Sequence, residues 1–310
     1  MSFKYKKLEK VKFKNGNSSQ KLHVNLKGNL VNTVFVNTLR RVCLDLIPFI
    51  AFNKDDIDIM KNTSIYNNDI IRLRLSTFPL IELKNTSELI NHINDFEQNK
   101  YSEDSFEKLS IFFSKNNDTN EVINVTTDDC QFYLGDKKID SIYKVPLLIT
   151  KLKQGEEIRG SCKSSIGIGL HNGIYCSVQR CCYEELKDNE FIFKIESRGQ
   201  ISEEEIMKRA CMIIVKKLQL IKERFSDKII NGNEIELLLQ NEDHTLGNLI
   251  TSYLQNNNNV TYAGYKIDHP LQREVEIILK TNGSKKLKTI FLETLDTIIY
   301  HFEKFEKKIK

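Results

Sequence analysis

The stretch NEDHTLGNLI, residues 241–250, holds the side chains of this sequence that are best suited to proton transfer. Asp243 and His244 are adjacent, and a carboxylate beside an imidazole is a common pair in general acid–base catalysis. No nucleophile stands at a helpful spacing from the pair, and the sequence around it has no glycine-rich phosphate loop. We therefore keep a stand-alone enzyme that uses this pair as an alternative and favour a structural interpretation.

The same stretch is typical of the first turn of a helix that packs closely against a neighbour. Asp243 or Thr245 can accept hydrogen bonds from the free amides of that turn. Gly247 lowers helix propensity by about 1 kcal/mol, and a glycine in a helix lets another backbone or side chain approach closely. We predict that residues 241–250 form a joint between parts of the protein, not an active site.

The cysteines and the remaining glycines do not predict a metal or phosphate site. There are seven cysteines, an odd number without framework spacing, which indicates a reducing, intracellular compartment. The stretch GIGLHNG (167–173) is not followed by a helix, so it does not predict a phosphate cradle. Four cysteines lie close together in sequence without any CxxC pair, namely Cys162, Cys176, Cys181 and Cys182. We expect neither a metal nor a cofactor.

Composition limits the class of protein. The 310 residues, 40% of them hydrophobic, are enough for two domains with real cores. No apolar run approaches the roughly 20 residues that span a bilayer, so we expect no membrane contact. The start of the sequence lacks the apolar region of a secretory signal.

The net charge of +4 is unevenly distributed. The segment 86–140 has twelve acids and five lysines, so the remainder of the chain is basic. A basic remainder keeps a free nucleic-acid-binding protein as an alternative. Arginine is scarce, and no stripe of basic and aromatic residues is present, so we expect no base-specific nucleic-acid contact.

Residues 29–47 are predicted to form a helix after a strand at 21–28. Arg40 and Arg41 lie on its polar side. They form either a solvated face or an anchor for an acidic partner, because guanidinium groups bind carboxylates at two points. Three further apolar residues share that polar side, which indicates a helix that touches two neighbours: Leu30, Val34 and Leu44.

From Ala51 onward the pattern is typical of strands, including both DIDIMKNTSIY and DIIRLRLSTFPLIEL. A strong helix follows at 201–225, where Ser202 and Glu205 form a predicted capping box. Further strand-like runs lie at 109–114, 121–126, 143–152, 177–186 and 191–199.

The layout of the N-terminal part recurs in miniature near the C-terminus. A strand at 234–240, a helix at 246–254, two strands and a long C-terminal helix follow in the same order. In the first copy, roughly 140 residues are inserted between the short helix and the last strand. The repeat is one of topology.

Several stretches, taken in order, resemble the bacterial RNA polymerase alpha subunit and its larger archaeal and eukaryotic counterpart. They are NTLRRVCLDLIPFIAF, NTSIYNNDIIRLRLSTFPL, YKVPLLITKLKQGEEI, GIGLHNG and FIFKIESRGQISEEEI. The stretch NEDHTLGNLITSYLQNNNNVTYAGYKIDHPLQREVEI resembles the smaller member of that pair. The chain is thus similar to a fusion of the two alpha-like subunits, an arrangement associated with large DNA viruses that transcribe their own genes.

The resemblance implies an α+β fold made of two alpha-like dimerisation modules, each a sheet that carries two helices. The two modules would pack as an intramolecular pseudo-dimer, and the first would be split around an inserted, mainly β domain. The implied ranges are 20–50 and 190–225 for the first module, 51–189 for the inserted domain with the acidic segment 86–140, 226–233 for a linker and 234–310 for the second module.

The resemblance also implies a function. The protein would be a non-catalytic assembly platform that nucleates association of the largest and second-largest RNA polymerase subunits, with small zinc-binding subunits docking nearby. Arg40 and Arg41 become the candidate partner contacts. The candidate residues of the internal dimerisation interface are Phe35, Leu39, Val42, Leu246, Leu249, Ile250 and Tyr253.

Two departures from the family pattern bear on these expectations. Many larger members carry a cysteine cluster in the inserted domain, whereas only Cys130 lies between residues 60 and 160 here. The tryptophan-containing segment that follows the glycines in the family is replaced by HNGIYCSV, residues 171–178. A viral source would place the protein in the host cytoplasm, in a viral factory, and in the virion.

Overall fold

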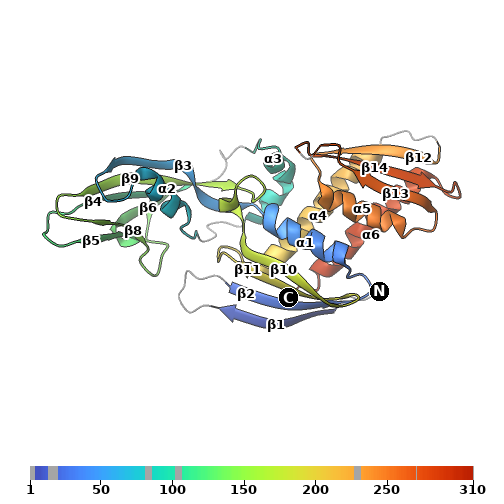
Figure 1. The fold of residues 1–310 in the computed structure, drawn as a ribbon, viewed down its shortest axis with the longest axis horizontal. Coiled ribbons are helices and arrows are strands. Elements are labelled where there is room, and N and C mark those ends of the chain that lie inside the picture. The colour runs from blue at the N-terminus through green and yellow to red at the C-terminus, as the bar shows by residue number, and fades with distance from the viewer. Residues whose placement is uncertain are drawn as a thin grey trace.

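The computed structural model describes residues 4–12, 20–80, 86–101, 107–226, 232–269 and 271–309. Figure 1 shows a β-rich domain at one end, a second sheet with helices at the other end and a third sheet below the middle of the molecule. The helices of the last two parts lie between their sheets. None of the described helices is long and apolar enough to cross a membrane.

The first module is a four-stranded antiparallel sheet with two helices on one face. Its strand order is β1 (Lys4–Lys12), β2 (Gln20–Lys27), β11 (Glu190–Ser197) and β10 (Val178–Lys187). The helices are α1 (Thr33–Asp45) and α4 (Glu203–Ser226). Burial alternates along β2, where Leu22, Val24 and Leu26 are fully buried and the residues between them are partly exposed. This period of two is what a sheet with one covered face requires.

The second module repeats this arrangement. Its sheet has the order β12 (Glu234–Gln240), β14 (Glu274–Thr281) and β13 (Val260–Lys266), and both pairings are antiparallel. The helices are α5 (His244–Gln255) and α6 (Leu287–Glu306). Strands β12, β13 and β14 occupy the positions of β2, β10 and β11 in chain order and in sheet order. The predicted topological repeat is confirmed.

The inserted domain contains a five-stranded sheet and a two-stranded sheet. The large sheet has the order β3 (Phe49–Asn62), β9 (Glu157–Gly167), β4 (Leu109–Asn116), β6 (Cys130–Leu134) and β7 (Lys137–Ile139). The small sheet pairs β5 (Ile123–Thr126) with β8 (Leu148–Leu152). Among the described residues, the helical segments of the insertion are α2 (Asn68–Ser76), η1 (Thr86–His92), α3 (Ile93–Glu97), η3 (Thr127–Asp129) and η4 (Gly173–Tyr175). Of these, η1 packs against α4, and α3 lies beside α1 and α4 (Figure 1).

The prediction of a strand at DIIRLRLSTFPLIEL is wrong for its first half, which forms helix α2. Asn67 caps this helix, since its side-chain oxygen accepts a hydrogen bond from the amide of Ile70 at 2.9 Å. Ile71 and Leu75, four residues apart, face the interior, whereas Leu73 is half exposed. Apolar residues alternate with arginines in this stretch, as in a strand. The buried residues are nevertheless spaced as in a helix. Residues 81–83 of the predicted strand lie outside the described residues.

The predicted boundaries of the split module also need correction. The boundary at 189/190 falls in the turn of the β10–β11 hairpin, and both strands of that hairpin belong to the sheet of the first module. Strand β1 adds residues before position 20 to the same sheet. The limits of the first module are set by pairing between strands that are far apart in the sequence. The periodicity of apolar residues along the chain does not indicate this pairing. Most of the predicted linker, residues 227–231, lies outside the described residues.

The glycines of GIGLHNG allow close packing between the inserted domain and α1. A Cβ atom added to Gly167 would lie 2.6 Å from the ring of Tyr175. One added to Gly169 would collide with the carbonyl oxygen of Leu44 and with Cys176. The glycine run therefore serves packing next to the C-terminal end of α1.

Gly247 packs α5 onto its own sheet. A Cβ atom at this position would lie 2.8 Å from the ring of Tyr265 on β13 and 2.9 Å from Val275 on β14. The predicted close approach is confirmed, and the neighbour is the sheet of the same module. Neither neighbouring atom is the far end of a flexible side chain.

Gly247→Ala is expected to destabilise the protein although alanine favours helices. The gain of about 1 kcal/mol in helix propensity is outweighed by a collision that costs roughly 1–3 kcal/mol. Equilibrium urea unfolding measures the difference, with Asn248→Ala at the exposed neighbouring position as control. A variant more stable than the parent would contradict this packing.

Candidate assembly interface between the two modules

Aromatic rings pack one module against the other. Phe35 of α1 stacks on Phe302 of α6 with ring centroids 4.5 Å apart, and it meets the edge of Phe305 at 5.3 Å. Helices α4 and α6 also pack together, with the rings of Phe225 and Phe291 4.3 Å apart. All five side chains are buried. Such rings supply most of the apolar area that an interface of this kind removes from water.

Helices α1 and α5 are in contact, and all seven of the predicted interface residues lie on them. Tyr253 differs from the others: it is half-buried, and its hydroxyl lies 3.0 Å from Nδ1 of His301 in the same module. The remaining six are buried, namely Phe35, Leu39, Val42, Leu246, Leu249 and Ile250. Their role in assembly stays a prediction.

Asp243 caps helix α5, and an arginine of the first module holds this cap. The Asp243 carboxylate accepts a hydrogen bond from the amide of Thr245 at 2.7 Å. Arg41 Nη2 donates to the same carboxylate at 2.9 Å, and Arg41 Nε donates to the Thr245 hydroxyl at 2.6 Å. Predicted helix capping by Asp243 is confirmed, and the cap is also a contact between modules.

The geometry disfavours Asp243–His244 as a catalytic pair. Burial raises the pKa of Asp243, but its hydrogen bonds from Thr245 and the nearby Arg41 outweigh burial and hold the pKa below its ordinary value. A carboxylate held in this way is a weak proton acceptor. His244 is exposed and its Nδ1 lies 3.3 Å from the Tyr265 hydroxyl.

The two predicted partner arginines have different surroundings. Arg41 lies between the modules and points at the α5 cap, with 33% of its side chain exposed. Arg40 Nε donates to Asn37 Oδ1 on its own helix at 3.0 Å, and its side chain is half-buried. Arg41 thus contributes to the internal joint, and a contact with a partner subunit stays a prediction for both residues.

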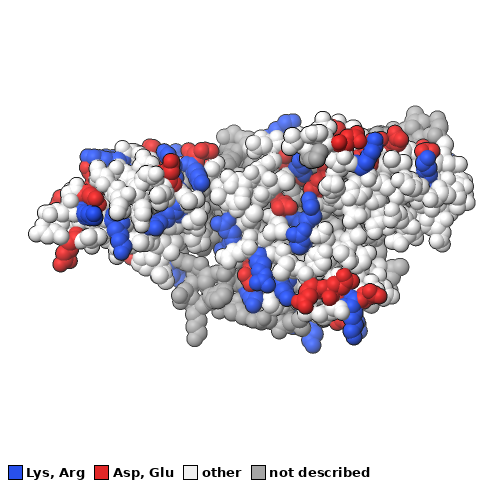
Figure 2. Space-filling model, viewed as in Figure 1, with Lys and Arg blue, Asp and Glu red and all other residues white. Residues whose placement is uncertain are grey.

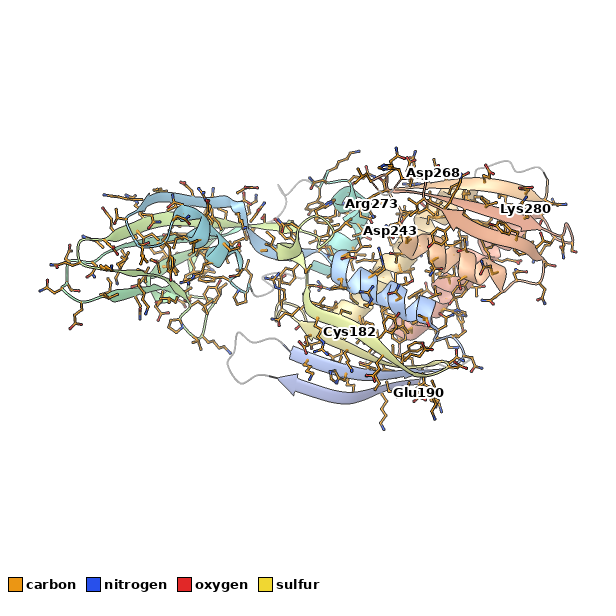
Figure 3. All side chains as sticks on the ribbon, viewed as in Figure 1. Cys182, Glu190, Asp243, Asp268, Arg273 and Lys280 are labelled. Carbon is orange, nitrogen blue, oxygen red and sulfur yellow. The ribbon has the colours of Figure 1, made fainter. Side chains whose placement is uncertain are left out.

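A buried ionic cluster joins three parts of the chain. Lys217 Nζ of α4 lies 2.7 and 2.6 Å from the two carboxylate oxygens of Glu97 in α3 and 3.0 Å from Glu242, which precedes α5. Arg273, which precedes β14, donates to Glu97 at 3.2 Å. The side chains of Lys217 and Glu97 are only 3% and 1% exposed. In Figure 3, the labelled Asp243 and Arg273 lie near this junction, beside α1 and α3.

The cluster keeps its cation charged inside the protein. Burial lowers the pKa of Lys217, but the carboxylates of Glu242 and Glu97 outweigh burial and raise the pKa above its ordinary value. Burial is also the largest influence on Glu242 and raises its pKa to about 7. Removing one partner from such a buried pair costs about 3–5 kcal/mol, because the other charge is left uncompensated.

Four residues of this cluster were not predicted from the sequence, namely Glu97, Lys217, Glu242 and Arg273. One signal was available for Lys217, which lies between Ile213, Ile214, Leu218 and Ile221 in the apolar stripe of the predicted helix. A lysine at such a position needs a buried partner. Glu97 is one of twelve acids in its segment, and nothing local distinguishes it. Among the residues that the structure describes, no group of three or more His, Cys, Asp or Glu could hold a metal.

Comparison with known proteins bears on both modules. Two family models described as the RNA polymerase Rpb3/Rpb11 dimerisation domain match residues 30–218 and 234–308. The chain is 24% identical to a protein of Acanthamoeba polyphaga mimivirus assigned as a DNA-directed RNA polymerase subunit, over 97% of this chain and 92% of the viral protein. It is also similar to the DNA-directed RNA polymerase subunit Rpo11 of two archaea. Saccharolobus shibatae Rpo11 is 38% identical over 22% of this chain and 73% of that subunit, and Metallosphaera sedula Rpo11 is 48% identical over 17% and 58%.

Leu249→Lys is expected to lower the free energy of unfolding by several kcal/mol. Leu249 is fully buried on α5, and a lysine there would bury a charge without a partner. Asn248→Lys makes the same substitution at the exposed neighbouring position and should change stability little. Thermal melting of both variants measures the contrast. Equal melting temperatures would show that this face of α5 is not buried.

Glu242 is expected to make stability fall as pH rises toward neutrality. Its folded-state pKa of about 7 exceeds its ordinary value of 4.5, so in this window the folded protein holds a proton that the unfolded chain has released. The stability due to this proton is complete below the unfolded pKa and is lost as pH rises through the folded pKa. Glu242→Gln should remove this dependence, whose slope is at most about 1.4 kcal/mol per pH unit.

Urea unfolding at a series of pH values between about 4.5 and 8 measures this slope. The contribution of Asp243 to the pH dependence of stability has the opposite sign, because its pKa is lowered. This contribution changes only below the ordinary Asp pKa of 3.8, outside this window. Glu236→Gln on the exposed side of β12 is the matched control. If the free energy of unfolding of the parent and of Glu242→Gln depends on pH in the same way, the Glu242 carboxyl does not have a raised pKa in the folded protein.

Proposed function

Because the chain belongs to the RNA polymerase Rpb3/Rpb11 dimerisation domain family, we propose that it is the non-catalytic assembly platform of a DNA-directed RNA polymerase. It carries two such dimerisation domains and is an alpha-like polymerase subunit. In the proposal, its two halves pair within one chain. The paired halves then nucleate association of the largest and second-largest subunits, and small zinc-binding subunits dock nearby.

The two hydrogen bonds from Arg41 to Asp243 and Thr245 are the observation that supports this proposal most directly. Residues 41 and 243 belong to the two different family matches, so the contact joins two dimerisation domains. A tether between binding partners replaces the entropy lost on association with an effective concentration in the millimolar range. Fusion thus favours a preformed pair over assembly from separate subunits.

A free nucleic-acid-binding protein is less compatible with the surface. On the face seen in Figure 2, lysines and arginines are interspersed with acids. Over the outer face of the first sheet, Lys27 pairs with Glu190 at 2.9 Å and Lys194 with Glu184 at 2.8 Å. Binding to a phosphate backbone requires basic groups that are free to neutralise phosphates and displace their counterions. Tight, salt-sensitive DNA binding by the isolated chain would favour this alternative.

The viral relative suggests where the platform acts. The mimivirus protein covers nearly the whole chain, and its name describes a polymerase subunit. We propose that the chain serves viral transcription in the host cytoplasm and that it is packaged in the virion. Identification of the chain among the proteins of purified particles tests the second part.

Arg40→Ala is expected to weaken capture of the second-largest subunit without changing the melting temperature. Arg40 is bonded only within its helix among the contacts of the described residues, so its guanidinium can bind an acidic partner surface. Arg41→Ala is the matched variant. It should lower the free energy of unfolding by roughly 1–2 kcal/mol, because it removes two hydrogen bonds of the joint.

A pull-down with purified second-largest subunit, together with thermal melting, separates the two effects. Full retention by Arg40→Ala would remove this residue from the partner contact. If the parent chain itself retained neither large subunit, the platform function would be wrong.

A further inference from the structure

Strand β12 differs from the other edge strands of the two modules, which are β1, β10 and β13. The pairing of each of those three with its neighbour contains a register shift. Shifts of this kind bend an edge strand and hinder its pairing with another chain. Strand β12 pairs with β14 without any shift, and its sequence, EIELLLQ, contains neither proline nor a basic residue. It therefore presents a regular edge at the margin of the second sheet (Figure 1).

The backbone groups at this edge can be assigned from the pairing of β12 with β14. The amide of Thr281 donates to the carbonyl oxygen of Asn233 at 2.8 Å, directly before the paired residues of β12. In an antiparallel pair, residues that bond to the opposite strand alternate with residues whose amide and carbonyl face away. The groups that face away thus belong to Glu236, Leu238 and Gln240. Among the residues that the structure describes, no hydrogen bond outside the sheet engages these groups.

A groove of about 310 Å³ lies along the second half of β12. This volume is at the lower end of the range of about 300–1,000 Å³ that is typical of ligand sites. The lining comes from both modules and consists of Ile221, Arg224 and Phe225 of α4, residues 237–240 of β12, and Glu242. A molecule bound there would contact the first module on one side and the second module on the other.

The groove continues the packing between the modules. The ring of Phe225 contacts that of Phe291 on α6, with centroids 4.3 Å apart. Leu237 and Leu239 are buried in the second module, so the floor of the groove has a fixed shape. Leu238 points to the other face of the sheet and is 48% exposed. A strand added at this edge would extend both the sheet and the contact between modules, and it would cover Leu238.

The lining favours an extended polypeptide over a nucleic acid. Unpaired amide and carbonyl groups along a strand are matched by the backbone of another strand, and alternate side chains add specificity. All lining residues are described, and Arg224 is the one cation among them. The one acid, Glu242, is already bonded to Lys217 at 3.0 Å. A phosphate chain requires several basic groups, which this groove does not supply.

A second copy of this chain is disfavoured as the occupant. The strand that it could offer to the edge is its own β12. Leu237 and Leu239 of that strand are already buried in their own module, so they cannot pack on the α4 side of the groove. The occupant is therefore a strand of different sequence.

We propose that an extended segment of another polymerase subunit adds to β12 as a fourth strand of the second sheet. Its backbone bonds to Leu238 and Gln240, and one of its apolar side chains covers Leu238 across the strands. The proposal rests on the assembly function given above. Because the segment contacts both α4 and β12, it binds the paired modules and so stabilises their pairing.

Photo-crosslinking in the purified polymerase, assembled with the full chain, tests this proposal. Benzoylphenylalanine is placed at position 240, which is exposed at the β12 edge, and in a second protein at position 262, which is exposed on β13 at the opposite edge. We expect at least tenfold more crosslink from position 240, to one segment of another subunit. Leu238→Pro should reduce this crosslink at least tenfold, because proline removes the amide that faces the added strand and spares the bonds to β14.

Leu238→Val keeps the amide and should leave the crosslink unchanged. Arg224→Trp fills the groove from the side of α4 and should also reduce the crosslink at least tenfold. Gln219→Trp, at an exposed position of α4 outside the lining, is its control and should have no effect. Thermal melting of each variant shows whether it is folded, and if Leu238→Pro is not, Arg224→Trp decides.

Four results would overturn the proposal while the platform function stands. They are a crosslink no stronger than that from position 262, a crosslink to nucleic acid, a crosslink to this chain itself, and a crosslink that persists in a folded Leu238→Pro or Arg224→Trp variant. Absence of the chain from the purified polymerase would instead contradict the platform function.

Discussion

A lysine buried far from water determines how the parts of this protein meet. Lys217 belongs to the first module, whereas its carboxylate partners come from the inserted segment and from the second module. An isolated ammonium in such surroundings is strongly unfavourable, so the buried Lys217 requires the docked carboxylate of Glu97, and Glu242 adds a second partner. Well-packed apolar residues in place of a buried ion pair are often equally stabilising. We therefore attribute to this cluster the relative placement of the three parts and not the bulk of the stability.

Apolar packing around α1 stabilises the contact between the two modules. Its buried side faces α4 and the rings of Phe302 and Phe305 on α6, and β10 and α5 also contact this helix. Val34 and Leu44, on the side expected to be polar, are partly buried against the core. The prediction that this helix touches two neighbours is thus confirmed. An isolated first module would expose these surfaces to water.

The role of residues 241–250 could be predicted because it depends on residue types that are close together in the sequence. Features that depend on pairing between distant segments could not be predicted. Helix capping by Asp243 and close packing at Gly247 depend on residue types within one turn, so sequence alone indicated both. Helix α2 was missed because its alternating residues imitate a strand, and the β10–β11 boundary depends on pairing with distant β2. The partners of Lys217 are 120 residues away in one direction and 25 in the other, and no local pattern connects them.

The central claim is that packing between the modules, and not the covalent connection, holds the two halves together. It is tested most directly by inserting a protease site in the linker 226–233, cutting the folded protein and measuring the mass of the product by light scattering. The account predicts that both pieces remain in one particle with the mass of the uncut chain and separate only under denaturing conditions. Two particles of smaller mass in native buffer would contradict it.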